Sequence, residues 1–107
     1  MLPKNRIVLH PGEMLLEGYL GPMGISQAEF ARRTGIAAPT ASEIVQGKRR
    51  VSSRLAIILG NTLGTGPEFW VRLQADHDFT RDRENMRRLS KLPKLTKPIQ
   101  AREPVEA

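Results

Sequence analysis

The side chains with a possible chemical role gather in one short stretch, from Ala38 to Arg49. Six of its residues are short or polar: Ala38, Pro39, Thr40, Ser42, Glu43 and Gln46. Hydroxyl groups can both donate and accept hydrogen bonds, and a carboxylate accepts them. Lys48 and Arg49 follow directly, and their positive charges bind anions. The stretch is therefore suited to a polyanionic partner that also presents hydrogen-bonding groups.

No arrangement of residues in the sequence matches a catalytic centre or a metal site. The chain has no cysteine, no Gly-rich phosphate loop, no HExxH pair and no G-x-S-x-G turn, and its two histidines, His10 and His77, are far apart in the sequence. Asp76-His77-Asp78 has the composition of a metal cluster. Consecutive helical residues point about 100° apart, however, and cannot converge on one ion. We therefore expect no enzyme activity, no cofactor and no metal.

Two short helices joined by a tight turn are predicted to position the polar stretch. Ser26 can cap the first helix, and Glu29, three residues on, can complete a capping box. Gly35 follows where that helix must stop, because glycine enters the left-handed region at low cost. Pro39 suits the first turn of the second helix, and Gly47 ends it. The stretch from Ser26 to Gly47 is therefore predicted to form a helix-turn-helix unit.

Such a unit assigns roles to these side chains, because its second helix enters the major groove of DNA with its N-terminal residues near base edges. The predicted base contacts are Ala38, Pro39, Thr40, Ser42, Glu43 and Gln46, and the predicted backbone contacts are Gln27, Lys48 and Arg49. Small apolar groups suit thymine methyls, and Glu43 suits cytosine N4. Because no Arg, Lys, Asn or Gln precedes Gln46 in this helix, bidentate reading of guanine or adenine is not expected before it. In the alternative interpretation, Thr40, Ser42 and Glu43 are merely solvated.

Three more helices are predicted to complete an all-α domain. The first opens at His10-Pro11-Gly12-Glu13 and ends at Gly21-Pro22. Another covers residues 53–63 after a cap at Ser52. The last begins at Pro67, after a glycine-rich break.

Three apolar side chains share one side of this last helix: Phe69, Trp70 and Leu73. A Trp and a Phe so close together usually belong to the core. Trp is also enriched in interface hot spots, so a role in a dimer interface stays open beside the core role.

The two ends of the chain differ in character from the domain between them. Residues 1–9 contain a proline and lack periodicity, which predicts an extended N-terminal arm; Ile7-Val8-Leu9 would pack there as a short strand or as an intersubunit contact. Residues 10–82 form the predicted domain. Residues 83–107 are predicted to be a flexible, basic, proline-containing tail that is partly disordered.

The composition of the 107 residues bounds the class of protein. Seventeen Lys and Arg against eleven Asp and Glu give a formal net charge of +6, which favours a nucleic-acid partner, although a basic balance also serves solubility. The absence of cysteine excludes disulfides and thiolate metal sites. No apolar run approaches the roughly 20 residues that span a bilayer. We therefore expect one cytoplasmic domain with no membrane segment.

Three blocks of sequence, in order, resemble HigA-type antitoxins, within the wider lambda-repressor-like (XRE/Cro) helix-turn-helix family. They are His10-Pro11-Gly12-Glu13, Ile44-Val45-Gln46-Gly47-Lys48-Arg49, and Pro67-Glu68-Phe69-Trp70 followed by Leu73-Gln74. The likeness covers about residues 10–79. Two positions depart from the family pattern: Ala41 stands where relatives often have a larger branched aliphatic residue, and His77 where they often have Tyr. There the resemblance predicts an altered helix contact and the loss of an aromatic contact.

The resemblance implies a five-helix, lambda-repressor-like domain that binds operator DNA as a homodimer and represses its own operon. It also implies a protein partner, a HigB-like RNA-cleaving toxin that is held inactive in the complex. Two alternatives stay open. One is a stand-alone transcriptional repressor without a toxin, and the other is a protein-interaction module whose tail folds on binding.

Overall fold

The computed structural model describes residues 2–3 and 6–95, and within them it contains helices and no strand. The elements are α1 (Pro11–Met14), η1 (Leu15–Leu20), α2 (Gly21–Met23), α3 (Gln27–Thr34), α4 (Ala38–Val45), α5 (Ser53–Leu63), α6 (Pro67–Arg81) and α7 (Arg83–Leu89). The first three form one continuous helical stretch, so the five predicted helices are present and α7 is an addition. The predicted all-α fold is confirmed. None of the helices in the described residues has the length and apolar character needed to cross a bilayer.

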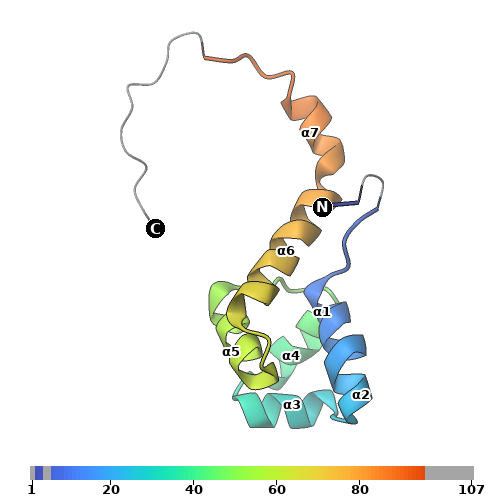
Figure 1. Ribbon diagram of the computed structural model, residues 1–107, viewed down its shortest axis with the longest axis vertical. Coiled ribbons are helices and arrows are strands. Elements are labelled where there is room, and N and C mark those ends of the chain that lie inside the picture. The colour runs from blue at the N-terminus through green and yellow to red at the C-terminus, as the bar shows by residue number, and fades with distance from the viewer. Residues whose placement is uncertain (1, 4–5, 96–107) are drawn as a thin grey trace.

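The helices form a compact body from which one end projects. Figure 1 shows α1 to α5 packed around the first half of α6, while the second half of α6 and α7 extend away from that body. Helix α3 lies at the opposite end of the molecule from α7. The first helix of the predicted helix-turn-helix unit and α7 are therefore separated along the long axis.

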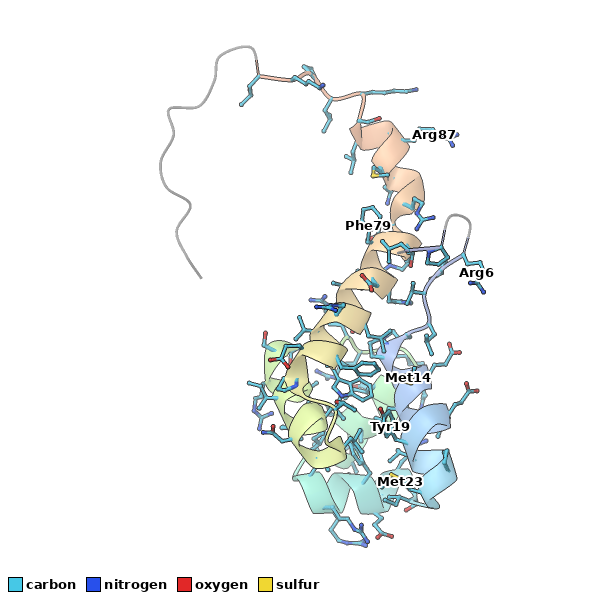
Figure 2. All side chains as sticks on the ribbon, viewed as in Figure 1. Arg6, Met14, Tyr19, Met23, Phe79 and Arg87 are labelled. Atoms are coloured by element: carbon cyan, nitrogen blue, oxygen red, sulfur yellow. The ribbon has the colours of Figure 1, made fainter. Side chains whose placement is uncertain are left out.

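Trp70 of α6 lies at the centre of the core and is completely buried within the single chain. Its indole Nε1–H donates to Thr65 Oγ1 at 2.8 Å, and its ring packs against Tyr19, with centroids 5.8 Å apart. Figure 2 shows Tyr19 on the side of the first helix that faces α6. Phe69 also meets Trp70 edge to face but stays 38% exposed, and Leu73 is partly buried. Of these three side chains, Trp70 belongs to the core, whereas Phe69 remains accessible to a partner.

The core around Trp70 collects buried side chains from η1, α3, α4 and α5 and from two of the connecting segments. They are Leu15, Leu20, Phe30, Ala31, Ile36, Ala41, Ile44, Val51, Leu55, Ala56 and Leu59. Ala41, the smaller residue at an inward position, is fully covered within this cluster. Burial of such apolar surface is the main driving force for a domain of this size.

The first helix does not end at Gly21-Pro22 as predicted. Residues of η1 form a π-helix, in which the Gly21 N–H bonds to the Leu16 carbonyl five residues earlier. This wider turn makes room for the Pro22 ring, which in an α-helix would meet the carbonyl four residues back. The helix instead ends at Gly24, which has a φ of 66°.

The caps of two helices follow the sequence signals, with one difference. Ser26 Oγ accepts a hydrogen bond from the Glu29 N–H at 3.1 Å, and Ser52 Oγ accepts one from the Leu55 N–H at 3.3 Å. The predicted second half of the capping box is not formed in the described structure. The Glu29 carboxylate pairs with Arg33 one turn further on, because a cation at this spacing on the same helix face competes for it.

The N-terminal arm packs on the second half of α6. The Val8 N–H donates to Thr80 Oγ1 at 2.8 Å, and His77 Nδ1 bonds to the Val8 carbonyl at 2.7 Å. The described arm residues contain no strand, so the strand alternative is not supported there. In the predicted tail, residues 83–89 are helical, and the part of the predicted disorder that falls on residues 96–107 lies outside the described residues.

Helices α1 and α4 meet backbone to backbone at Gly12. A Cβ atom added to Gly12 would lie 1.7 Å from the carbonyl oxygen of Ile44 and 3.1 Å from the Cα of Val45. Backbone atoms cannot move aside as a flexible side chain can. The position of α4 therefore depends on the absence of a side chain at residue 12.

Gly12→Ala should lower the free energy of unfolding by about 1–3 kcal/mol or more, because α1 and α4 must separate to admit the methyl group. Gly18→Ala is the matched control. Its added Cβ would meet only the flexible side chain of Met14, with Sδ at 2.9 Å and Cγ at 3.9 Å, and it gains up to about 1 kcal/mol of helix propensity. Urea unfolding of both variants measures the difference. Equal stability of the two variants would contradict the close-contact argument.

Candidate nucleic-acid interface

Helices α3 and α4 and the turn between them form the predicted helix-turn-helix unit. Gly35 ends α3 with a φ of 79°, and its N–H donates to the Ala31 carbonyl at 2.9 Å. Ile36 then enters the core, which anchors the turn. Helix α4 begins after Ala37, which offers no side-chain cap. Because Pro39 has no N–H, the first turn of α4 offers the N–H groups of Ala38 and Thr40 to an anion, which helix N-termini favour.

All nine predicted DNA-contacting residues keep access to solvent. Ala38, Pro39, Gln46, Lys48 and Arg49 are exposed, and Gln27, Thr40, Ser42 and Glu43 are partly exposed. The inward positions Ala41 and Ile44 of α4 are buried. Helix α4 thus has one face packed into the core and one face open to a partner.

Two pairs of side chains on this open face are joined in the structure. Gln46 Nε2 donates to Ser42 Oγ at 2.8 Å. Arg49 Nε donates a hydrogen bond to Glu43 Oε1 at 2.9 Å, and Arg49 Nη2 forms an ion pair with the same oxygen at 2.9 Å. Sequence reasoning gave Glu43 and Arg49 separate roles, one at the bases and one at the phosphates. The structure instead places them in direct contact.

Ion pairs distribute the positive charge around the unit unevenly. Arg33 pairs with Glu29, Arg49 with Glu43, and Arg50 with Asp78. Within the described part of the chain, Arg32 and Lys48 have no acidic partner. Arg32 borders a shallow hollow of about 340 Å³ between α3 and the start of α4. Arg32 and Lys48 are therefore the cations of this surface whose charge is least compensated.

Gln74 of α6 holds in place the basic loop after α4, Lys48-Arg49-Arg50, a role that sequence reasoning missed. Its buried side chain accepts a hydrogen bond from the Val51 N–H at 2.7 Å and donates to Asp78 Oδ1 at 2.8 Å. Asp78 in turn binds Arg50 through its other oxygen. The residues next to a buried helical glutamine do not indicate which distant group it will bind. The only signal in the sequence was that Gln74 belongs to the Leu73-Gln74 block of the family resemblance. The network fixes the loop that carries Lys48 and Arg49.

The two histidines, distant in sequence, meet beside the end of α4. Their rings lie edge to face with centroids 5.0 Å apart. His10 Nδ1 accepts a hydrogen bond from the Gly12 N–H at 2.9 Å and so caps α1. The predicted loss of an aromatic contact at His77 is wrong, because His10 supplies one. The His10 ring also lies next to Gly47, where a Cβ atom would sit 3.8 Å from its Cγ.

The environment of His10 lowers its pKa below the ordinary value of 6.5. Burial is the largest cause, and the neighbouring His77 and the more distant Arg81 act in the same direction, against Asp78 and Glu13. Protonation of Nδ1 would also remove the acceptor of the cap. No group of three or more His, Cys, Asp or Glu in the described residues is arranged to hold a metal ion.

Known proteins with similar sequences include HTH-type transcriptional regulators, virulence-associated proteins and an antitoxin. The family model described as helix-turn-helix matches residues 17–70. YddM, an HTH-type transcriptional regulator of Escherichia coli K12, is 36% identical over 84 residues, which cover 74% of this chain and 88% of YddM. Antitoxin HigA-1 of Vibrio cholerae is 38% identical over 74 residues, which cover 67% of this chain and 70% of HigA-1.

Two solved structures with DNA share the fold. The Pseudomonas aeruginosa antitoxin HigA, solved with the higBA promoter, has a TM-score of 0.75 and 33% identity over 82% of this chain and 98% of that one. The antitoxin GraA in complex with its operator has a TM-score of 0.76 and 32% identity, over 91% of this chain and all of that chain (100%). The likeness therefore extends well beyond the helix-turn-helix unit.

Gln74→Met should lower the free energy of unfolding by about 1–3 kcal/mol, because it leaves the Val51 N–H without its acceptor in a buried place. Gln46→Met, at an exposed glutamine of α4, is the matched control and should change stability by no more than about 0.5 kcal/mol. Denaturant unfolding of both variants decides the matter. A loss no larger at residue 74 than at residue 46 would show that the loop does not depend on this bond.

Stability should fall as the pH drops through about 6.5, because the unfolded chain then takes up a proton on His10 that the folded chain resists. The contribution is fully present above the ordinary pKa and is lost below it. His10→Ser keeps an N-terminal cap that does not titrate. Urea midpoints at about pH 7.5 and about pH 5.5 should therefore differ less in His10→Ser than in the wild type. An identical shift in both proteins would rule out His10 as the source.

Proposed function

The chain belongs to the helix-turn-helix family, and from this membership we propose that it is a sequence-specific DNA-binding antitoxin that represses its own operon. One observation carries the proposal. The outward face of α4 is accessible to solvent. Its inward face is held by the backbone contact at Gly12, and the loop after it is held by the hydrogen bond from Val51 to Gln74. A preorganised helix with an adjoining basic loop is what major-groove binding requires.

The charge of the surface supports DNA as the partner. Arg32 lies near the start of α4 and Lys48 follows its end, and neither pairs with an acidic side chain in the part of the chain that the structure describes, so both would bind phosphates. Phosphate contacts fix the register of such a protein, and base contacts supply its sequence preference. The relatives solved with a promoter or an operator are antitoxins of the same fold.

The proposed working form is a homodimer on a two-fold operator. Two copies would place their α4 helices about 34 Å apart, which is one turn of DNA. The exposed ring of Phe69 and other exposed apolar side chains of α6 offer surface for contact between copies. As an antitoxin the chain would act in the cytoplasm without catalytic activity of its own, and its protein partner would be a HigB-like RNA-cleaving toxin.

A stand-alone repressor would show the same DNA surface without the toxin, and a protein-interaction module would not bind duplex DNA. Co-expression with the genomic neighbours separates the first alternative. An antitoxin should co-purify with an adjacently encoded small protein and remove its toxicity. The stand-alone repressor would be favoured if the chain purified without a partner and if no neighbouring gene were toxic when expressed.

Lys48→Ala should weaken binding to all duplexes alike, because among the described residues Lys48 has no acidic partner. The loss of one phosphate contact should flatten the plot of log K against log salt by about 0.9 per subunit, or about 1.8 in a dimer. The measurement is a salt titration on a duplex selected from a random library by the wild type, and on unselected duplex. Lys91→Ala, at an exposed lysine beyond α7, is the control and should keep the wild-type slope. Duplex binding that is absent, or that ignores salt, would contradict the proposed function.

A further inference from the structure

The open face of α4 lacks an obvious group for reading guanine. Guanine O6 and N7 are read by the N–H donors of arginine or lysine, and arginine presents two of these donors in a fixed fork. The helix itself offers a glutamine at its end, Gln46, and otherwise small, hydroxyl or acidic side chains. Gln46 is engaged with Ser42 through its Nε2. A guanine-reading group would therefore have to come from outside the helix.

Arg49 reaches this face from the loop beyond α4. Its guanidinium folds back to Glu43, which lies two residues before the last residue of the helix, and places Nε and Nη2 at 2.9 Å from Glu43 Oε1. The cation thus lies beside the last turn of α4 and not out in the loop. The sequence shows only that Arg49 follows α4 in a loop, and Arg49 was therefore predicted to bind phosphates.

The backbone on both sides of Arg49 is fixed. The Lys48 N–H donates to the Glu43 carbonyl at 2.8 Å, and the Gly47 N–H donates to the Ile44 carbonyl at 3.0 Å. These two bonds close a Schellman turn, which Gly47 permits with a φ of 76°. On the other side, Arg50 is bound to Asp78 and the Val51 N–H to Gln74. The backbone that carries Arg49 is consequently held in place, with the side chain of Arg49 next to Glu43.

The contact with Glu43 leaves one edge of the guanidinium unused. A guanidinium carries five N–H donors in a plane, and Nε–H with one Nη2–H faces the carboxylate. The second Nη2–H and one Nη1–H form the fork at the end of the group, which matches guanine and which no side chain of the described residues occupies. The side chains of Arg49 and Glu43 are 49% and 46% exposed, and ion pairs this exposed add little to stability. The contact orients Arg49 and has little weight in holding the fold together.

We propose that Arg49 reads a guanine in the major groove and that Glu43 is its positioning residue. The inference rests on the proposed DNA-binding function and deepens it by naming a base and the group that reads it. It reverses the sequence-based roles of both residues, because it makes Arg49 the base reader and removes Glu43 from direct contact with cytosine. In the competing arrangement, Arg49 leaves Glu43 to bind a phosphate.

Arg49→Lys separates the two arrangements, because lysine keeps the charge but loses the fork. Wild type and variant are each used to select duplexes from the same random library, and the enriched sequences are compared. If Arg49 reads guanine, the variant should lose preference at one G·C pair per half-site by about 5- to 150-fold, with an unchanged salt slope. Arg50→Lys, at the neighbouring arginine that faces Asp78, should keep the wild-type preference.

A chemical probe locates the contacted atom. Replacing that guanine by 7-deazaguanine removes the N7 acceptor and should weaken wild-type binding, yet leave Arg49→Lys nearly unaffected. If Arg49 binds a phosphate instead, Arg49→Lys keeps the base preference, and the probe affects both proteins alike. That result would overturn the inference and leave the DNA-binding function standing.

Glu43 is tested through its coupling to Arg49. Glu43→Ala should reduce preference at the same G·C pair without weakening overall binding, since it also removes a negative charge, and Glu43→Gln should restore part of the preference through its amide oxygen. In an Arg49→Lys background, Glu43→Ala should change the preference no further. An additive effect would mean that Glu43 contacts a base itself and would overturn its positioning role. Failure of the wild type to enrich any sequence would overturn the proposed function together with this inference.

Discussion

The backbone contact between Gly12 and the Ile44 carbonyl is the constraint on which the rest of the structure depends. It brings α1 and α4 together with no side chain between them, so their separation is set by atoms that cannot change rotamer. The inward residues of α4 then reach the core around Trp70, and the outward residues are left to solvent. The orientation of the candidate recognition helix is therefore a property of the main chain.

Helix α6 carries the second set of constraints. Its completely buried tryptophan fills the core, and four of its polar residues hold segments that have no regular structure. Gln74 and Asp78 bind the basic loop, and His77 and Thr80 bind the N-terminal arm. One long helix thus positions both the loop beside α4 and the start of the chain. These bonds join segments more than twenty residues apart, which local helix propensity cannot do.

The parts of the fold that the sequence predicted well are those set by neighbouring residues. Ser52, Gly35 and Gly47 mark helix ends through their own caps and backbone angles, and the structure agrees. Pro22 misled the prediction, because a π turn made room for it and such a turn depends on packing. The contact of Arg49 with Glu43 crosses a loop whose shape depends on distant Gln74, so neither its existence nor its consequence could be read from spacing.

One face of α4 is packed into the core and the other is exposed, and this has a consequence for how the sequences of such chains diverge. Substitutions at Pro39, Ser42 or Gln46 change no core packing, so the preferred operator can drift while the fold keeps its stability. Where a genome encodes several related chains, each chain must bind its own operator and not the operators of the others. Duplicated copies can therefore come to prefer different operators through a few surface substitutions, and each variant along the way still folds.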